Sequence, residues 1–324
     1  MPGDTDVNAS RMHDILAESR VIKNAEEIEV MRWASQITSE CHVAVLRKVK
    51  PGMRENQIES FFNFHGQQKY FTGRVAPYIS ICGCGPNAAT LHYQDADKTL
   101  IDGQIMLTDQ GHSLQHYCSD VTISFPVNGK FTEKQAAIYN IVNAASQAVM
   151  QVLAPGIDWV EMHLLSERTL LQGLKDLGCL SGDVAEMQEK RIGFLFMPCG
   201  LGHFIGLDVH DVGGYLPNNP ERIMKPGLMK LRTARKMEAG MCITIEPGIY
   251  FRTFLLNGEV DKSFFDFDLS YLNMEKIREY QAEVGGVRIE DVMVVTETGC
   301  ENLSYDIPRS VHEIELCMQG KQWK

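Results

Sequence analysis

Five residues with metal-binding side chains stand in distinctive local sequences along the chain: Asp109, Asp120, His203, Glu246 and Glu290. Four carboxylates and one imidazole form a donor set suited to a pair of divalent cations. The four negative charges balance two such ions, and a water molecule bound to them loses roughly 8 pKa units relative to bulk water. The set therefore predicts metal-assisted hydrolysis, with a metal-bridging hydroxide as the nucleophile.

The five residues are more informative together than singly, because a lone strand carboxylate or a lone histidine near glycines is usually structural. Asp109, Glu246 and Glu290 each follow apolar, β-prone residues, and a buried carboxylate without a partner is unfavourable by several kcal/mol. A shared cation cluster removes that penalty for all of them. Oxygen-rich ligation with one imidazole favours Mn(II), with Co(II), Fe(II) and Zn(II) also compatible.

Strands must hold these ligands, since the candidates fall on or beside segments rich in β-branched residues and bounded by glycine. The predicted strands cover residues 77–82, 104–108, 119–125, 241–251 and 287–296. Ligands on a sheet keep their geometry better than ligands on loops.

Helices are predicted between these strands, which gives an α+β fold class. One begins after Asn24, where Glu27 completes a capping-box pattern, and ends near Pro51. The others are expected over residues 55–68, 132–152, 159–177 and 274–280. Residues 1–14 are polar and aperiodic, and are predicted to form a flexible tail ahead of one domain over 15–324.

Composition narrows the functional classes. The chain has 324 residues with 44% hydrophobic and 23% charged residues, as in globular proteins. A net charge of -11 argues against nucleic acid as a partner. No apolar run approaches the roughly 18 residues of a membrane span, and the polar amino terminus lacks the apolar core of a signal peptide. We therefore expect a cytoplasmic protein whose nine cysteines are reduced.

Four further residues are candidates for a layer around the ligands: Tyr78, His92, His210 and Arg232. From the residues alone, each could equally be a hydrogen-bonded loop residue or, for the arginine, a solvated one.

Several segments in order carry a resemblance to a known family. They are residues 118–132 (CSDVTISFPVNGKFT), 201–215 (LGHFIGLDVHDVGGY), 231–235 (LRTAR), 246–251 (EPGIYF), 285–291 (GGVRIED) and 308–315 (PRSVHEIE). The sequence from about Ile15 to Met318 resembles the Xaa-Pro dipeptidases, or prolidases, of eukaryotic type. These belong with aminopeptidase P, methionine aminopeptidase and creatinase among the metallopeptidases with the pita-bread fold.

This resemblance implies a curved, mainly antiparallel sheet backed by helices, with two metal ions in its concave face. It implies hydrolysis of dipeptides that end in proline. Asp120 and Glu290 would bridge the ions, Asp109 would complete one site, and His203 with Glu246 would complete the other. The resemblance also implies that the smaller amino-terminal domain of prolidases is missing from this chain, and it is compatible with a homodimer.

The resemblance also assigns roles to the residues around the metals. Glu246 would transfer protons, and His92 would contact the scissile amide. His210 and Arg232 would hold the proline carboxylate, and Tyr78 would line the site. A guanidinium on that free carboxylate would select dipeptides over longer peptides, which distinguishes this prediction from an aminopeptidase P-like exopeptidase.

One position departs from the family pattern. The family reads His-Gly-Leu-Gly-His before the metal-binding histidine, whereas this chain has Cys199 at the first of these positions. A thiol is a weak hydrogen-bonding group and does not replace an imidazole. The alternatives are therefore a catalytically weak or inactive pita-bread protein, or a binding module without metal, and reduced hydrolysis is expected.

Overall fold

Antiparallel strands carry most of the candidate ligands in the computed structural model, which describes residues 11–259 and 265–324. The strands are β1 (Ile81–Cys84), β2 (Ile105–Gln110), β3 (Ser113–Leu114), β4 (Tyr117–Cys118), β5 (Val121–Pro126), β6 (Cys242–Ile245), β7 (Gly248–Tyr250), β8 (Gly286–Arg288), β9 (Asp291–Val295) and β10 (Cys300–Asn302). They pair in the orders β1-β2-β5, β10-β9-β6, β3-β4 and β7-β8, all antiparallel.

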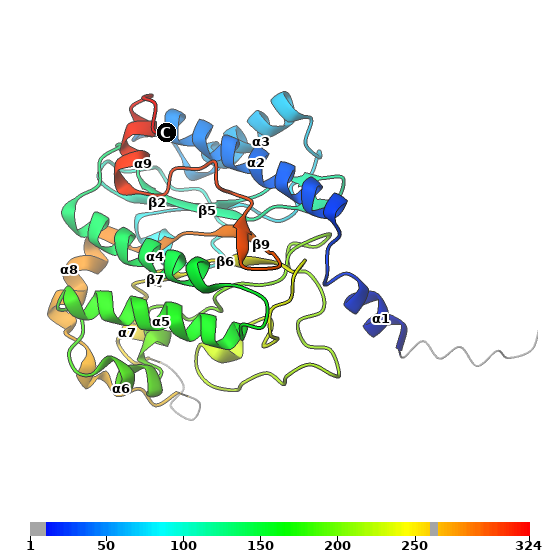
Figure 1. Ribbon diagram of the computed structural model, residues 1–324. Coiled ribbons are helices and arrows are strands. Elements are labelled where there is room, and N and C mark those ends of the chain that lie inside the picture. The colour runs from blue at the N-terminus through cyan, green and yellow to red at the C-terminus, as the bar shows by residue number, and fades with distance from the viewer. Residues whose placement is uncertain (1–10, 260–264) are drawn as a thin grey trace, which may run out of the picture.

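Helices flank these strands on both sides, as Figure 1 shows. They are α1 (Met12–Ser19), α2 (Ala25–Lys48), α3 (Glu55–Tyr70), α4 (Glu133–Val152), α5 (Trp159–Asp176), α6 (Val184–Glu189), α7 (Thr253–Leu256), α8 (Met274–Val284) and α9 (Val311–Met318). Helices α2 and α3 contact each other on one side of the strands, and α4 and α5 contact each other on the other side. The α+β class with antiparallel sheets is confirmed.

Local sequence explains where the helices begin and end. The Asn24 side chain accepts from the backbone N–H of Glu27, and the Glu27 carboxylate accepts from the backbone N–H of Asn24, so the predicted capping box is present. Helix α2 ends at Lys48, shortly before Pro51, whose ring cannot continue a helix. A hydrophobic core joins the two helical layers through buried residues such as Phe62, Phe125 and Tyr139.

Two predicted strands are wrong in their continuity. The stretch 241–251 is divided into β6 and β7 because Pro247 has no N–H to donate to a ladder. The stretch 287–296 is divided into β8 and β9, with Glu290 between them. Each break falls at or directly beside a candidate ligand, so the interruption presents that carboxylate at the end of a strand.

The predicted amino-terminal tail overlaps a helix. Residues 1–10 lie outside the described residues, but Met12 to Asp14 belong to α1, so the helical part begins three residues before the predicted boundary. In Figure 1, α1 projects away from the other helices. Its last turn is fastened by Glu18, which accepts from both terminal nitrogens of Arg235 at 2.8 and 2.9 Å.

Candidate metal centre

The β1-β2-β5 sheet and the segment between β8 and β9 meet at the candidate ligands. Asp109 lies in β2 opposite Thr122 of β5, and Asp120 directly precedes β5. Thr122 in turn forms an isolated antiparallel bridge with Glu290, between β8 and β9. Each therefore contributes carboxylates to one place, and all are buried except Glu246, which is half-buried. The structure brings together four acids that lie up to 181 positions apart in sequence.

His203 reaches the same place through a close backbone approach. Its N–H donates to Thr244 Oγ1 at 3.1 Å, and its carbonyl accepts from the Thr244 N–H at 2.9 Å. The preceding residue must be glycine, because a Cβ at Gly202 would lie 1.9 Å from the Thr244 carbonyl oxygen. The Gly-Leu-Gly-His sequence thus allows the histidine segment to lie against β6.

The imidazole of His203 is held in one orientation. Its Nδ1 lies 3.0 Å from the Phe204 carbonyl oxygen, which fixes Nδ1 as the protonated nitrogen. The Nε2 atom then has a free lone pair and lies 3.5 Å from Asp120 Oδ2 and 3.5 Å from Glu246 Oε1. A histidine that donates one N–H to a carbonyl and points the other nitrogen at carboxylates is arranged as a metal ligand.

The cluster carries more negative charge than its protein surroundings neutralise. Burial and the neighbouring carboxylates raise the pKa values of Asp120 and Glu290 well above the usual range. Burial raises the pKa of Glu246 to about 7. Divalent cations would relieve this repulsion, and ligand atoms of Asp120, His203 and Glu290 lie within 4.8 Å of one another. The donor set therefore fits metal ions that prefer oxygen with one imidazole.

Tyr78 lies among the carboxylates, as expected. Its hydroxyl oxygen is 2.6 Å from Asp120 Oδ1 and 2.8 Å from Asp109 Oδ1. One hydroxyl proton can be donated to only one carboxylate at a time, so Tyr78 links the two acids and fixes their spacing.

Arg288 is a site residue that sequence reasoning missed. It is 3% exposed and donates to Asp109 Oδ2 at 2.6 Å, to the Tyr250 hydroxyl at 2.9 Å and to Thr122 Oγ1 at 3.1 Å. Its position two residues before Glu290 was the available signal, since residues i and i+2 of an extended chain face the same side.

Three predicted substrate residues lie at the open side of the cluster. His92, His210 and Arg232 are exposed, yet they line the same pocket of about 620 Å³ as the five ligand candidates. Partial desolvation of the two rings inside the pocket lowers the pKa of His210 to about 3 and also lowers that of His92, so both imidazoles are neutral at pH 7. Arg232 makes no ion pair with a carboxylate in residues 11–259 or 265–324.

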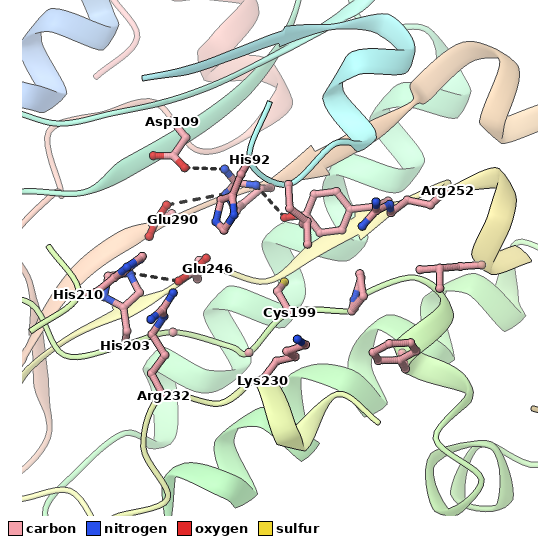
Figure 2. A pocket seen from close by; sticks show the side chains of 18 of the residues that line it. His92, Asp109, Cys199, His203, His210, Lys230, Arg232, Glu246, Arg252 and Glu290 are labelled. Atoms are coloured by element: carbon pink, nitrogen blue, oxygen red, sulfur yellow. Dashed lines mark hydrogen bonds and ion pairs between the residues drawn. The ribbon is translucent and has the colours of Figure 1, made fainter. Parts of the chain in front are cut away.

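Cys199 also lines this pocket, on the side away from Asp109 (Figure 2). Burial and the charge of Glu246 raise the pKa of its thiol to about 12, so the sulfur is protonated at neutral pH. All nine cysteines, which lie within the described ranges, are free thiols, in agreement with the predicted reduced state.

The sequence profile of metallopeptidase family M24 matches residues 29–297. The chain belongs to this family. Human Xaa-Pro dipeptidase is 45% identical over 322 residues, which cover 97% of this chain and 63% of the human protein. The M24 chain therefore spans less than two thirds of that curated relative.

Solved structures of M24 relatives share the fold. Aminopeptidase PepP of Pseudomonas aeruginosa superposes with a TM-score of 0.79 at 34% identity, over 95% of this chain and 62% of that one. Zinc-substituted Escherichia coli aminopeptidase P, in complex with product, gives the same TM-score, identity and coverage. The predicted pita-bread fold is thus confirmed. Among the helices of the described residues, none has the length and apolar character to cross a membrane.

Proposed function

We propose that this chain is a dinuclear metallopeptidase that hydrolyses Xaa-Pro dipeptides. The observation that carries the proposal is one pocket that holds five buried or half-buried metal-ligand candidates and the exposed Arg232. Arg232 has no carboxylate partner within the described ranges of the chain. The name of the human relative, Xaa-Pro dipeptidase, supports the same activity. The higher identity to that relative than to the aminopeptidase P structures favours a dipeptidase over an aminopeptidase P-like exopeptidase.

Two divalent ions, with Mn(II) as the proposed metal, would be held by the five ligand candidates. Asp120 and Glu290 would contact both ions, Asp109 one of them, and His203 with Glu246 the other. Bound ions would supply Lewis acidity and a water molecule of lowered pKa. Tyr78 and Arg288 hold the Asp109 and Asp120 carboxylates in place for this purpose.

Glu246 is the proposed proton-transfer residue. A carboxylate oxygen that is not bound to a metal ion can accept a proton from water and pass it on. The departing prolyl nitrogen must gain a proton, because it becomes a secondary amine when the bond breaks. Glu246 lines the pocket beside His203, where a substrate amide next to the ligand cluster would be within its reach.

Arg232, His210 and His92 are the proposed substrate contacts. Arg232 has five N–H donors and is paired with no carboxylate of the described residues, so it can bind the proline carboxylate with two parallel hydrogen bonds. His210 is neutral and can donate one N–H to the same carboxylate, while His92 can contact the scissile amide. These contacts do not need an amide N–H on the substrate, which the Xaa-Pro bond lacks.

Comparison of Gly-Pro with Gly-Pro-Gly tests the assignment. We expect kcat/KM for Gly-Pro to exceed that for the tripeptide, in which an amide replaces the carboxylate that Arg232 would bind. Arg232→Met should lower kcat/KM for Gly-Pro by about 10- to 100-fold, the value of a charge-assisted hydrogen bond. Equal or faster cleavage of Gly-Pro-Gly would instead assign the chain as an aminopeptidase P-like exopeptidase.

A further inference from the structure

Two positively charged side chains in the pocket have no role in the proposed reaction. Lys230 and Arg252 line it together with Cys199, and Figure 2 shows them on opposite sides of Cys199 in that view. Neither makes an ion pair with a carboxylate in the part of the chain that the structure describes. The guanidinium carbon of Arg252 instead lies 4.6 Å from the centroid of the Phe254 ring.

Ordered backbone holds both cations at the pocket wall. Lys230 ends a short 3-10 helix, Leu228–Lys230, and its backbone N–H donates to the Gly227 carbonyl at 3.0 Å. Arg252 precedes α7 and its carbonyl accepts from the Leu256 N–H at 3.0 Å. Lys230 is exposed and Arg252 is half-buried, so the two side chains can reach a ligand in the pocket while keeping contact with water.

Apolar side chains also line this pocket. Leu91, Phe194, Pro198 and Leu255 line the pocket, and Phe194 stacks on Phe265 with ring centroids 5.2 Å apart. A substrate group that fits this wall therefore combines a short aliphatic stem with a charged end.

The charges outside the ligand cluster are unbalanced. Among the residues that the structure describes, the pocket lining outside the ligand cluster adds one carboxylate to Lys230, Arg232 and Arg252. It belongs to Glu259, which accepts from Asn257 Nδ2 at 2.9 Å. Arg232 is assigned to the proline carboxylate, so a positive surplus remains for a second anionic group. In a dipeptide that ends in proline, only the side chain of the first residue can supply that group.

We propose that Lys230 and Arg252 bind an acidic side chain on the residue before proline, so that Glu-Pro is preferred over neutral dipeptides of the same size. This inference rests on the proposed function and names its substrate class. It assigns Lys230 and Arg252 as specificity-determining residues for the first substrate position.

Hydrolysis of Glu-Pro and Gln-Pro tests the inference, because these peptides have the same shape and differ in one charge. We expect the ratio of their kcat/KM values to be about 5 to 10 in favour of Glu-Pro, since two partly solvated cations act on that charge. Increasing NaCl from 50 to 500 mM should reduce the ratio by screening.

Substitutions test whether Lys230 and Arg252 recognise the acidic side chain or affect hydrolysis of every dipeptide. Lys230→Met and Arg252→Met should each lower the Glu-Pro to Gln-Pro ratio, and the double substitution should bring it to about one. Lys236→Met and Arg278→Met, at exposed positions outside the pocket, should leave the ratio unchanged. A wild-type ratio near one, or an equal loss for both peptides in the pocket variants, would overturn the inference.

Gly-Pro serves as the reference substrate for the function itself. If Mn(II)-loaded protein does not hydrolyse Gly-Pro, the proposed function fails, and Glu-Pro and Gln-Pro are then compared by isothermal titration calorimetry on the same protein. Tighter binding of Glu-Pro that is lost in the double variant would support the acidic subsite. Equal affinities, or no binding of either peptide, would refute it.

Discussion

Replacement of Arg288 by methionine should destabilise the metal-free protein strongly. The residue is 3% exposed, and its side chain donates to a carboxylate at 2.6 Å, a phenol at 2.9 Å and a threonine hydroxyl at 3.1 Å. Methionine has a similar length but no donor, so the substitution leaves the Asp109 carboxylate buried without its cation. Removal of one partner from a buried ion pair typically lowers the free energy of unfolding by 3–5 kcal/mol. We expect a loss of about 3 kcal/mol, because nearby Tyr78 still bonds the same carboxylate.

Urea unfolding at pH 7.5 in the presence of EDTA measures this loss. Arg288→Lys should be intermediate, since an ammonium keeps the charge but cannot span three acceptors in a fixed fork. Arg278→Met is the matched control, because Arg278 is exposed on α8 and should change the stability by less than about 0.5 kcal/mol. A loss for Arg288→Met no larger than that of the control would refute the claim that Arg288 is the cation balancing Asp109.

Substitutions at three further positions test other parts of the site and the core. Gly202→Ala should lower the free energy of unfolding by about 2 kcal/mol, because the new Cβ would meet the Thr244 carbonyl. The rate of Gly-Pro hydrolysis should fall by at least about 100-fold. A melting temperature by circular dichroism and an activity equal to those of the wild type would contradict this. Burial lowers the pKa of His163 to about 3, so stability should fall as pH decreases below about 6.5, by about 2 kcal/mol at pH 5 for this residue. The free energy of unfolding, measured with urea, should therefore differ between pH 7.5 and 5.0 by about 2 kcal/mol less in His163→Leu than in the wild type. An unchanged difference in the variant would contradict the role assigned to His163. Cys199→His should raise kcat for Gly-Pro about tenfold, whereas Cys199→Ser should change it less than threefold; equal rates for both variants would show that no imidazole is needed there.

Local patterns in the sequence predicted most elements of the fold. The capping box at Asn24 and the proline after α2 each act within a few residues, so they are readable without tertiary structure. The breaks between β6 and β7 and between β8 and β9 were not predicted, because both flanks of each break remain apolar and β-prone. Pro247 was the local sign of the first break, and Glu290 occupies the second.

The metal-ligand candidates and Tyr78 could be predicted because each lies in a distinctive segment, whereas two other residues that support the ligands, Arg288 and Thr122, could not. Arg288 reads as one more charged residue in a strand, and its role depends on Asp109, which is 179 positions away. Thr122 bonds the Glu290 carboxylate at 2.7 Å across a similar separation. Long-range contacts of this kind follow from how the two strand groups meet, and no local pattern encodes that meeting.

Metal content measured beside Gly-Pro hydrolysis, for the wild-type chain and Glu290→Ala, tests the metal centre most directly. The proposed centre predicts about two Mn(II) ions per wild-type chain after reconstitution, with hydrolysis that rises with metal loading. Glu290→Ala should bind at most about one ion and lose hydrolysis, because it removes the carboxylate that would contact both ions in the proposed centre. Wild-type metal content and turnover in Glu290→Ala would contradict the proposed centre.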